Sequence, residues 1–384
     1  MARRKSKKLT FGSVLMSLIM LVVIVAGYYV YNKYFKKEEP VIEAKGELSF
    51  HFMMLGNDKA GDCVYIKAGD NDILIDAGSR ENSIDDIQNY VNKYCIDGIL
   101  EYVIVTHADQ DHIAGFSKSN GSIFDLFECR TIIDFPLTNK TTQTYNRYVT
   151  ERTAEVNNGA KHFTAIECYN ESKEGAKRVY NLTEDGNIKF EVLYNYFYEN
   201  KSEDENNYSV CVMFFHGSRQ FLFTGDLEKE GEEYLAEKYD FSQVELYKAG
   251  HHGSRTSSNE CLLKEIKPKM CVVCCCAGSV EYTDNLDRTF PTQDMINRIA
   301  PYTDKVYVPI TIDIIQVKGT DTPDNPNDDD YNNYGELKLL NGNIIVCSDA
   351  EKGVYVECSN NNTLLKDTEW FKKYRKMPDE WKVA

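Results

Sequence analysis

The chain has 384 residues, of which 42% are hydrophobic and 27% are charged, as in an ordinary globular protein. This composition excludes wholesale disorder, a collagen-like repeat and a polytopic membrane protein. The 60 acidic and 44 basic side chains give a formal net charge of −16. The sequence shows no basic face, which excludes broad contact with nucleic-acid phosphates. An anionic substrate would have to be engaged at a single site, where a metal ion can supply positive charge.

Residues 1–35 predict a basic cytoplasmic tail and a transmembrane anchor. The first eight residues, MARRKSKK, carry five basic side chains, and an uncharged apolar run follows from Leu9 to Tyr31. About 20 apolar residues cross a bilayer as a helix. More positive charge precedes the run than follows it, so we expect a single-pass protein of the cell membrane with its body outside the cell. The alternative, a cleaved signal peptide, lacks a small-residue cleavage site after the run.

A polar linker is expected at 36–46, followed by a domain at 47–350 with an exposed acidic loop at 320–334 and by a packed C-terminal extension at 351–384. Alternating apolar patterns predict strands and helices, and Asn341–Gly342 predicts a hairpin turn. Strands are expected at 48–55, 63–78 (a hairpin), 101–106, 189–196, 209–215, 220–226, 244–250, 270–276, 305–310 and 336–349. Helices are expected at 84–94, 143–158, 228–238, 261–266 and 293–299. This order indicates an α/β fold with two sheets between helices; a doubly wound sheet is the alternative.

Four of the seven histidines lie in two short polar segments, each directly after an expected strand. The first segment places four potential ligands within six residues: His107, Asp109, Asp111 and His112. This density can serve two metal ions, and imidazole nitrogen with carboxylate oxygen suits zinc, manganese or iron. The alternative is a solvated loop with capping aspartates, which does not explain two histidines.

Three further strand ends supply candidate ligands. Asp226 follows an apolar strand and a Thr-Gly turn, and a carboxylate there can bridge two cations. His251 and His252 are flanked by glycines, and we expect one of them to bind metal and the other to contact substrate or a carboxylate. The pattern does not choose between them. Asp76 ends another strand and can orient a ligand histidine.

The motifs resemble those of the metallo-β-lactamase superfamily and, more closely, the extracytoplasmic hydrolase domain of the ComEC/Rec2 competence proteins. Their order and approximate spacing match along residues 47–310, and the two histidine-bearing motifs together are highly specific. The motifs are His51-Phe52, Gly61-Asp62, LIDAG at 74–78, THADQDHIAG at 106–115, NNYS at 206–209, LFTGD at 222–226 and KAGHHGSRTS at 248–257.

The resemblance implies an αβ/βα four-layer sandwich with two divalent ions, zinc or manganese, between the sheets. His107 and Asp109 would serve one ion and Asp111 and His112 the other, with Asp226 as the bridge. The His251–His252 pair would complete the site. A metal-bound hydroxide would be the nucleophile, with Asp111 and His252 in the catalytic centre. The residues expected to contact a phosphate oxygen are Asn207, Ser209 and Ser254.

Three departures from the family pattern qualify this inference. Asp109 stands where the general superfamily has a second histidine, which favours manganese over a pure zinc site. Phe290-Pro291 stands where ComEC-type domains often have His-Pro, so one contact is lost. The chain has one predicted span instead of a multispan channel, so DNA import does not follow.

The sequence therefore predicts a membrane-anchored, extracytoplasmic, metal-dependent phosphodiesterase or nuclease. Its expected partners are the membrane, through the N-terminal helix, and a phosphodiester substrate, whether nucleic acid, nucleotide or wall polymer; no protein partner is indicated. Two alternatives stay open. The same site could hydrolyse carbonyl substrates such as lactones, thioesters or β-lactams, or the chain could be a surface binding protein with a degenerate site.

Overall fold

The computed structural model describes residue 20 and residues 46–283, 285–318 and 331–382, with side chains described outside 313–335. The chain divides into residues 1–41 and 42–384, and the fold given below is that of the second part. Apart from residue 20, the predicted anchor lies outside the described residues, as does the predicted linker apart from residue 46. Among the residues that are described, no helix is long and apolar enough to span a bilayer.

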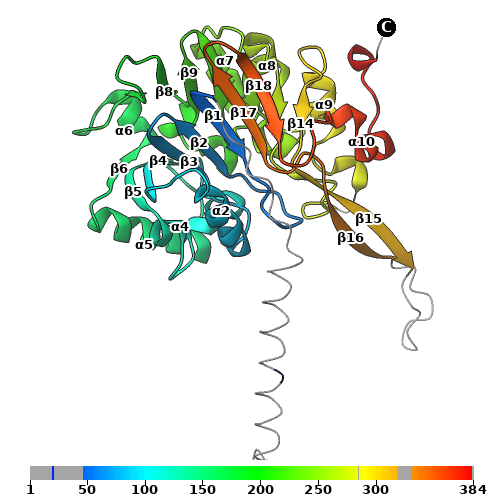
Figure 1. Ribbon diagram of the computed structural model, residues 1–384, viewed down its shortest axis with the longest axis horizontal. Helices are drawn as coiled ribbons and strands as arrows, with labels where there is room; N and C mark the ends of the chain where they lie inside the picture. The colour runs from blue at the N-terminus through cyan, green and yellow to red at the C-terminus, as the bar shows by residue number, and fades with distance from the viewer. Residues whose placement is uncertain (1–19, 21–45, 284, 319–330, 383–384) are drawn as a thin grey trace, which may run out of the picture. The chain divides into compact units, whose positions relative to one another are not determined.

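The first sheet has eight strands in the order β18-β17-β1-β2-β3-β4-β5-β6 (Figure 1). Neighbours from β18 to β3 are antiparallel, and those from β3 to β6 are parallel. The strands are β1 Leu48–Phe52, β2 Val64–Ala68, β3 Asn71–Ile75, β4 Ile99–Val105, β5 Glu128–Asp134, β6 Lys161–Thr164, β17 Ile344–Asp349 and β18 Gly353–Cys358.

The second sheet has seven strands in the order β14-β12-β11-β10-β9-β8-β7, antiparallel from β7 to β10 and parallel beyond. A third, three-stranded sheet has the order β13-β15-β16. The strands are β7 Val179–Asn181, β8 Ile188–Val192, β9 Val212–His216, β10 Arg219–Phe223, β11 Leu246–Lys248, β12 Cys271–Val272, β13 Cys276–Ala277, β14 Val306–Tyr307, β15 Ile310–Lys318 and β16 Tyr331–Leu339.

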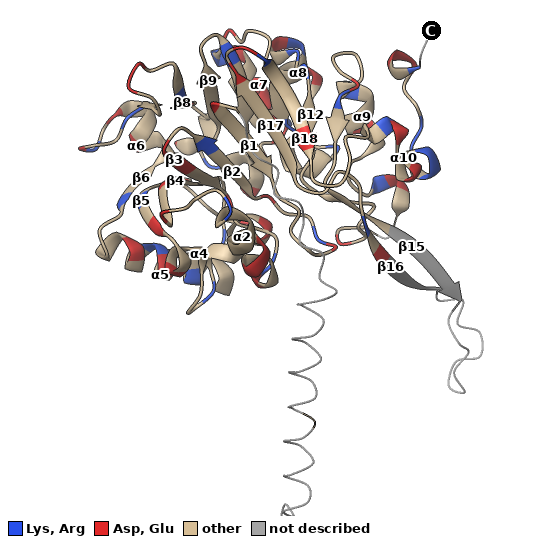
Figure 2. Cartoon of the chain, in the orientation of Figure 1, with Lys and Arg blue, Asp and Glu red and all other residues tan. Residues whose placement is uncertain are grey.

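Helices flank the two large sheets, and their apolar faces complete two hydrophobic cores. Side chains of α2, α4 and α5 join one core and those of α7 to α10 the other. This is the α/β sandwich with mixed sheets that the resemblance implies. Acidic and basic side chains are interspersed along these elements (Figure 2). The helices are α2 Ile84–Val91, α3 Gln110–Ile113, α4 Ile123–Leu126, α5 Gln143–Asn157, α6 Ala165–Asn170, α7 Lys229–Lys238, α8 Glu260–Ile266, α9 Gln293–Ile299 and α10 Glu369–Tyr374.

The prediction of a hairpin around Asn341–Gly342 is wrong. The strand before this turn, β16, pairs with β15, whereas the strand after it, β17, pairs with β1 and β18. The Asn341 side chain accepts from the Val308 amide at 2.9 Å and donates to two carbonyls of the C-terminal segment. The turn therefore carries the chain from one sheet to another. Residues 331–334, expected in the acidic loop, belong to β16, and 319–330 lie outside the described residues.

The two large sheets meet through an aromatic cluster centred on Phe50 of β1. Its ring lies 5.5 Å from that of Phe214, 4.7 Å from that of Phe221 and 5.4 Å from that of Phe223, all on the second sheet. All four side chains are almost completely buried. Aromatic pairs at such distances add to the hydrophobic free energy of burial. This cluster fixes the spacing between the sheets whose strand ends carry the site.

We expect Phe50→Ala to lower the free energy of unfolding by about 3–5 kcal/mol, because it removes a buried ring and leaves a cavity between the sheets. Urea denaturation of the full chain would measure this. Phe50→Leu keeps most of the volume and should cost clearly less. Equal stability of the alanine variant and the wild type would contradict the role given to this cluster.

Candidate metal centre

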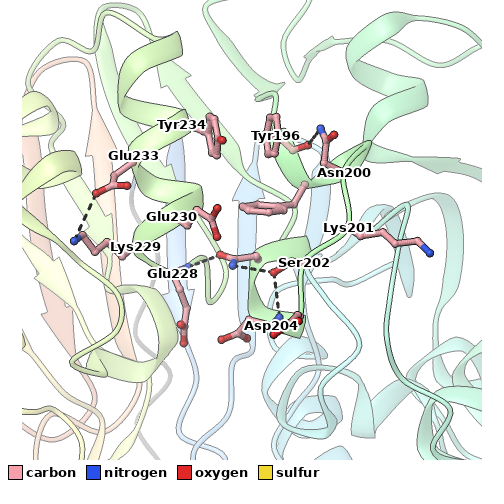
Figure 3. Close-up of a pocket in the computed structure, with 13 residues that line it drawn as sticks. Tyr196, Asn200, Lys201, Ser202, Asp204, Glu228, Lys229, Glu230, Glu233 and Tyr234 are labelled. Atoms are coloured by element: carbon pink, nitrogen blue, oxygen red, sulfur yellow. Dashed lines mark hydrogen bonds and ion pairs between the residues drawn. The ribbon is translucent and has the colours of Figure 1, made fainter.

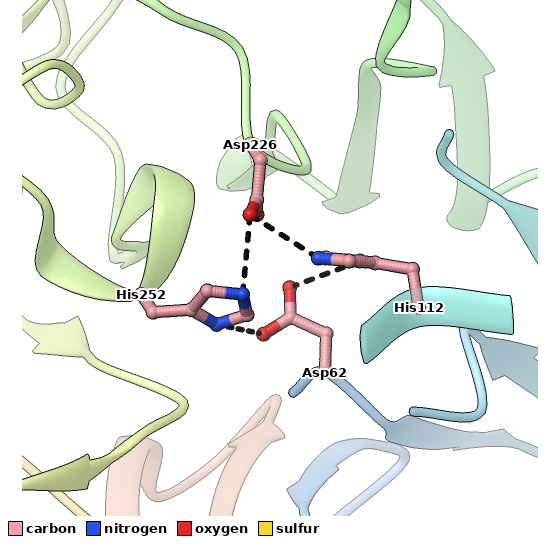
Figure 4. Close-up of side chains that lie close together, drawn as sticks. All are labelled: Asp62, His112, Asp226 and His252. Atoms are coloured by element: carbon pink, nitrogen blue, oxygen red, sulfur yellow. Dashed lines mark ion pairs between the residues drawn. The ribbon is translucent and has the colours of Figure 1, made fainter. Parts of the chain in front are cut away.

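The predicted ligands come together where strands of the two large sheets end. His112 lies on α3, just after β4, and Asp226 follows β10. His252 lies in the 3-10 turn η5, Gly250–Gly253, after β11. Asp62 enters from the loop before β2. Figure 4 shows these four side chains pointing toward one another.

One potential ligand atom from each of these residues lies within 4.8 Å of those from the other three. One oxygen of Asp226, Oδ2, is 3.2 Å from Nε2 of both His112 and His252. Asp111 Oδ2 is also 3.2 Å from His252 Nε2. All these side chains are buried. Asp226 thus occupies the central position that the resemblance assigns to a bridging carboxylate.

Contacts of Nδ1 orient the imidazole rings of His112 and His252, whose Nε2 atoms point into the cluster. Nδ1 of His112 lies 2.8 Å from Asp76 Oδ2, and Nδ1 of His252 lies 2.8 Å from the Cys274 carbonyl oxygen. An Nδ1–H donated to these oxygens leaves the Nε2 lone pair free for a metal ion. Both Nε2 atoms are buried and have no hydrogen-bond partner among the described residues. This is the donor arrangement that a divalent ion requires.

Negative charge dominates the electrostatics of the cluster. Burial disfavours a charged imidazole, but the carboxylates of Asp226 and Asp76 raise the pKa of His112 well above its usual value. The pKa of Asp226 lies well below its usual value. Burial raises it, but the charges of His112, His252 and Lys248 lower it by more. The cluster therefore attracts cations strongly, in agreement with the fit of its donor atoms to metal.

A second group of donors lies beside the first. His107 Nε2 is buried without a hydrogen-bond partner among the described residues and is 3.6 Å from Asp109 Oδ2. The His107 ring centroid is 4.1 Å from that of His112. The other oxygen of Asp109 pairs with Lys140. His107 and Asp109 thus offer two further donor atoms beside His112, at the positions to which the resemblance assigns an ion.

The adjacent histidines point apart. Both have left-handed backbone angles, with φ of 44° at His251 and 52° at His252. His252 enters the cluster, whereas His251 Nδ1 lies 3.0 Å from Glu228 Oε1 and 3.1 Å from Thr256 Oγ1. The structure therefore places His252 in the cluster and His251 against Glu228.

The three expected phosphate contacts all make hydrogen bonds within the protein. Ser209 Oγ accepts from the Asp226 amide at 3.0 Å and so supports the central carboxylate. Asn207 Oδ1 accepts from the Glu228 amide at 3.3 Å, and Ser254 Oγ lies 2.9 Å from Thr256 Oγ1.

Asn207 and Glu228 also line a cavity of about 770 Å³ on this side of the protein (Figure 3). Its wall is rich in carboxylates, and the rings of Tyr196 and Tyr234 stack there with their centroids 4.0 Å apart. The Glu228–His251 contact connects this wall to the residue next to His252.

Sequence reasoning did not single out Asp62, Lys248 or Tyr282 as site residues. The Lys248 amine is buried, pairs with Asp62, lies 3.4 Å from Asp226 Oδ1 and donates to the Gly225 carbonyl at 3.0 Å. The Tyr282 hydroxyl donates to Asp111 Oδ2 at 2.7 Å. A signal existed for the first two, since Asp62 and Lys248 stand in motifs that carry the resemblance. Tyr282 lies in a segment without a motif.

Phe290 occupies the position where the family pattern often has histidine. Its ring centroid lies 6.2 Å from that of His252, 5.8 Å from that of His251 and 5.7 Å from that of Tyr282. An apolar ring therefore packs beside the centre at this point, and no ligand nitrogen is supplied there.

Comparison with known proteins agrees with this geometry. Residues 56–118 match the family model of the metallo-beta-lactamase superfamily. The chain is 27% identical over 176 residues to ComE operon protein 3 of Bacillus subtilis, covering 45% of this chain and 20% of that protein. It is 40% identical over 77 residues to competence protein ComA of Neisseria gonorrhoeae, covering 19% of this chain and 11% of that protein. The chain thus spans a fifth or less of the length of these relatives.

A similar solved structure is the metallo-beta-lactamase fold protein YhfI from Bacillus subtilis, at 12% identity and a TM-score of 0.40, covering 68% of this chain and 95% of that one. By the match at residues 56–118 and by these sequence similarities, the chain is similar to the metallo-β-lactamase superfamily and to competence proteins of the ComEC/Rec2 type.

Proposed function

We propose that this metallo-β-lactamase-type hydrolase cleaves phosphodiester bonds outside the cell, held at the membrane by its N-terminal segment. The observation that carries the proposal is the set of buried Nε2 atoms of His107, His112 and His252, which have no hydrogen-bond partner among the described residues. They converge with buried carboxylates on a centre suited to two divalent ions, zinc or manganese.

Each residue of the centre has a role that its contacts support. Asp226 lies between His112 and His252, where a carboxylate can be shared by two ions. Asp76 fixes the ring of His112. Asp111, which accepts from Tyr282, faces His252 and is placed to orient a water molecule. Divalent ions held here would lower the pKa of bound water and polarise the phosphoryl group.

The charge of the protein favours a substrate with few phosphates. Its net charge is −16, and basic and acidic residues are interspersed along the elements drawn in Figure 2. A polyanion needs a row of cations to replace its counterions. We therefore favour nucleotides, short nucleic-acid ends or wall-linked phosphodiesters as substrates. The apolar run at Leu9–Tyr31 supports the anchor, and the excess of basic residues before it supports the outward orientation.

We expect Asp226→Ala to abolish manganese- or zinc-dependent hydrolysis of bis(p-nitrophenyl) phosphate, because it removes the carboxylate that lies between His112 and His252 and would hold the ions. A rate decrease of at least ~10³-fold corresponds to about 4 kcal/mol of transition-state stabilisation. Release of p-nitrophenol by the full chain measures it, and Asp185→Ala, at an exposed loop carboxylate, is the control. Undiminished turnover in Asp226→Ala would refute the assignment. Hydrolysis of p-nitrophenyl acetate without hydrolysis of the phosphodiester would favour the alternative in which the site acts on carbonyl substrates.

We expect the full chain to bind two divalent ions, and their removal with EDTA to lower its melting temperature. Ions that bind only the folded state stabilise it by about 2.7 kcal/mol at a hundredfold excess over Kd. Elemental analysis and thermal unfolding before and after chelation would measure both effects. A chain that takes up no metal and whose melting temperature is unaffected by EDTA would favour the surface-binding alternative.

A further inference from the structure

A lysine outside every recognised motif reaches the centre. Lys140 lies in the loop between β5 and α5, and its amine pairs with Asp109. Its side chain is 31% exposed, whereas that of Lys248, the other lysine paired with a site carboxylate among the described residues, is 3% exposed. Lys140 therefore stands at the water-facing side of the centre and Lys248 at its base.

The loop that carries Lys140 is held in place by hydrogen bonds. The buried carboxylate of Glu205 accepts from Thr138 Oγ1 at 2.6 Å and from the Asn139 amide at 2.7 Å. The Lys140 amide donates to Thr138 Oγ1 at 2.9 Å, and the Tyr208 hydroxyl donates to the side-chain oxygen of Asn139 at 3.3 Å. The position of Lys140 is thus built into the fold, unlike that of an ordinary surface lysine.

The balance of charges in the centre leaves the amine of Lys140 available to bind an anion. Two divalent ions and the amine of Lys248 would balance the five carboxylates of the centre, which are those of Asp62, Asp76, Asp109, Asp111 and Asp226. Lys248 is buried and already paired with Asp62, so it cannot reach a substrate. The partly exposed amine of Lys140 is available to the negative charge of a phosphodiester entering from solvent, because an ion bound to Asp109 would weaken the attraction between that carboxylate and the amine.

A lysine amine such as that of Lys140 carries a positive charge at neutral pH, because its ordinary pKa lies well above 7. A charged amine that donates to an anionic oxygen forms one of the stronger hydrogen bonds in proteins.

We propose that Lys140 binds an anionic oxygen of the substrate's phosphoryl group and so selects phosphoryl substrates over uncharged esters. This inference rests on the proposed function and deepens it. Lys140 is a specificity-determining residue in this role, and Asp109 holds its amine until substrate arrives.

The test compares Lys140→Met, Lys140→Arg and the control Lys269→Met in the full, manganese-loaded chain. Lys269 pairs with Glu245 at 2.6 Å just before β12, away from the strand ends that form the centre. Titration calorimetry measures the binding of inorganic phosphate, and elemental analysis measures manganese content. We expect Lys140→Met to weaken phosphate binding by roughly 10- to 100-fold, the effect of one lost charged hydrogen bond. Lys140→Arg should retain most of the affinity, and Lys269→Met all of it.

Unchanged phosphate affinity in Lys140→Met would overturn the inference, as would a wild-type chain that binds no phosphate. A parallel loss of manganese would also overturn it, because the lysine would then act through Asp109. Hydrolysis gives a separate readout. Lys140→Met should raise KM for bis(p-nitrophenyl) phosphate with a smaller change in kcat. If the wild type binds phosphate through Lys140 but does not hydrolyse the diester, the proposed function fails while the binding role stands.

Discussion

The buried carboxylates of Asp62, Asp76 and Asp226 are the constraint on which the rest of the site depends. Each is at most 2% exposed. A buried charge costs several kcal/mol unless an opposite charge lies beside it. Lys248 and the two imidazoles of the cluster provide that charge. An ion that binds Nε2 of a charged histidine must displace its proton, so metal uptake at this centre is coupled to proton release.

The sandwich architecture brings these charges together from distant parts of the sequence. Carboxyl-terminal strand ends of both sheets point into the same space, as in other α/β sites. The loops from the two sheets approach each other so closely here that one backbone position has no room for a side chain. Gly225 has a φ of 55°, and a Cβ there would lie 2.9 Å from the Cβ of Thr106, on the opposite sheet. A glycine before Asp226 is therefore required for the central carboxylate to reach the histidines.

Much of the centre was predictable because its donors are dense in the sequence. The segment from His107 to His112 has too many ligand-type residues for a solvated turn, and Asp226 and the histidine pair follow apolar strands. The choice between His251 and His252 was not predictable, since it depends on two left-handed backbone conformations. The pairing of Asp62 with Lys248 and the contact of Tyr282 with Asp111 are long-range contacts, which no local pattern encodes.

In the fold as well, local features were predictable from the sequence and long-range strand pairing was not. Apolar periodicity places most strands and the helix Gln293–Ile299 correctly. It fails at Asn341–Gly342, where a strong turn signal leads to a change of sheet because β1 offers β17 an antiparallel edge. Turn residues fix the local backbone, whereas partner strands are chosen by burial across the whole domain.

The electrostatics of the protein act over short distances. With a net charge of −16, the protein repels an anionic polymer at long range, and salt screens that repulsion beyond about 8–10 Å. An anion would be attracted only at the centre, and only when divalent ions occupy its carboxylates. The carboxylate-lined cavity next to Glu228 adds a second constraint, because it disfavours further phosphates on that side. For the phosphodiesterase proposed above, both constraints favour a substrate that presents one phosphodiester at a time, and they oppose tracking along a nucleic-acid strand.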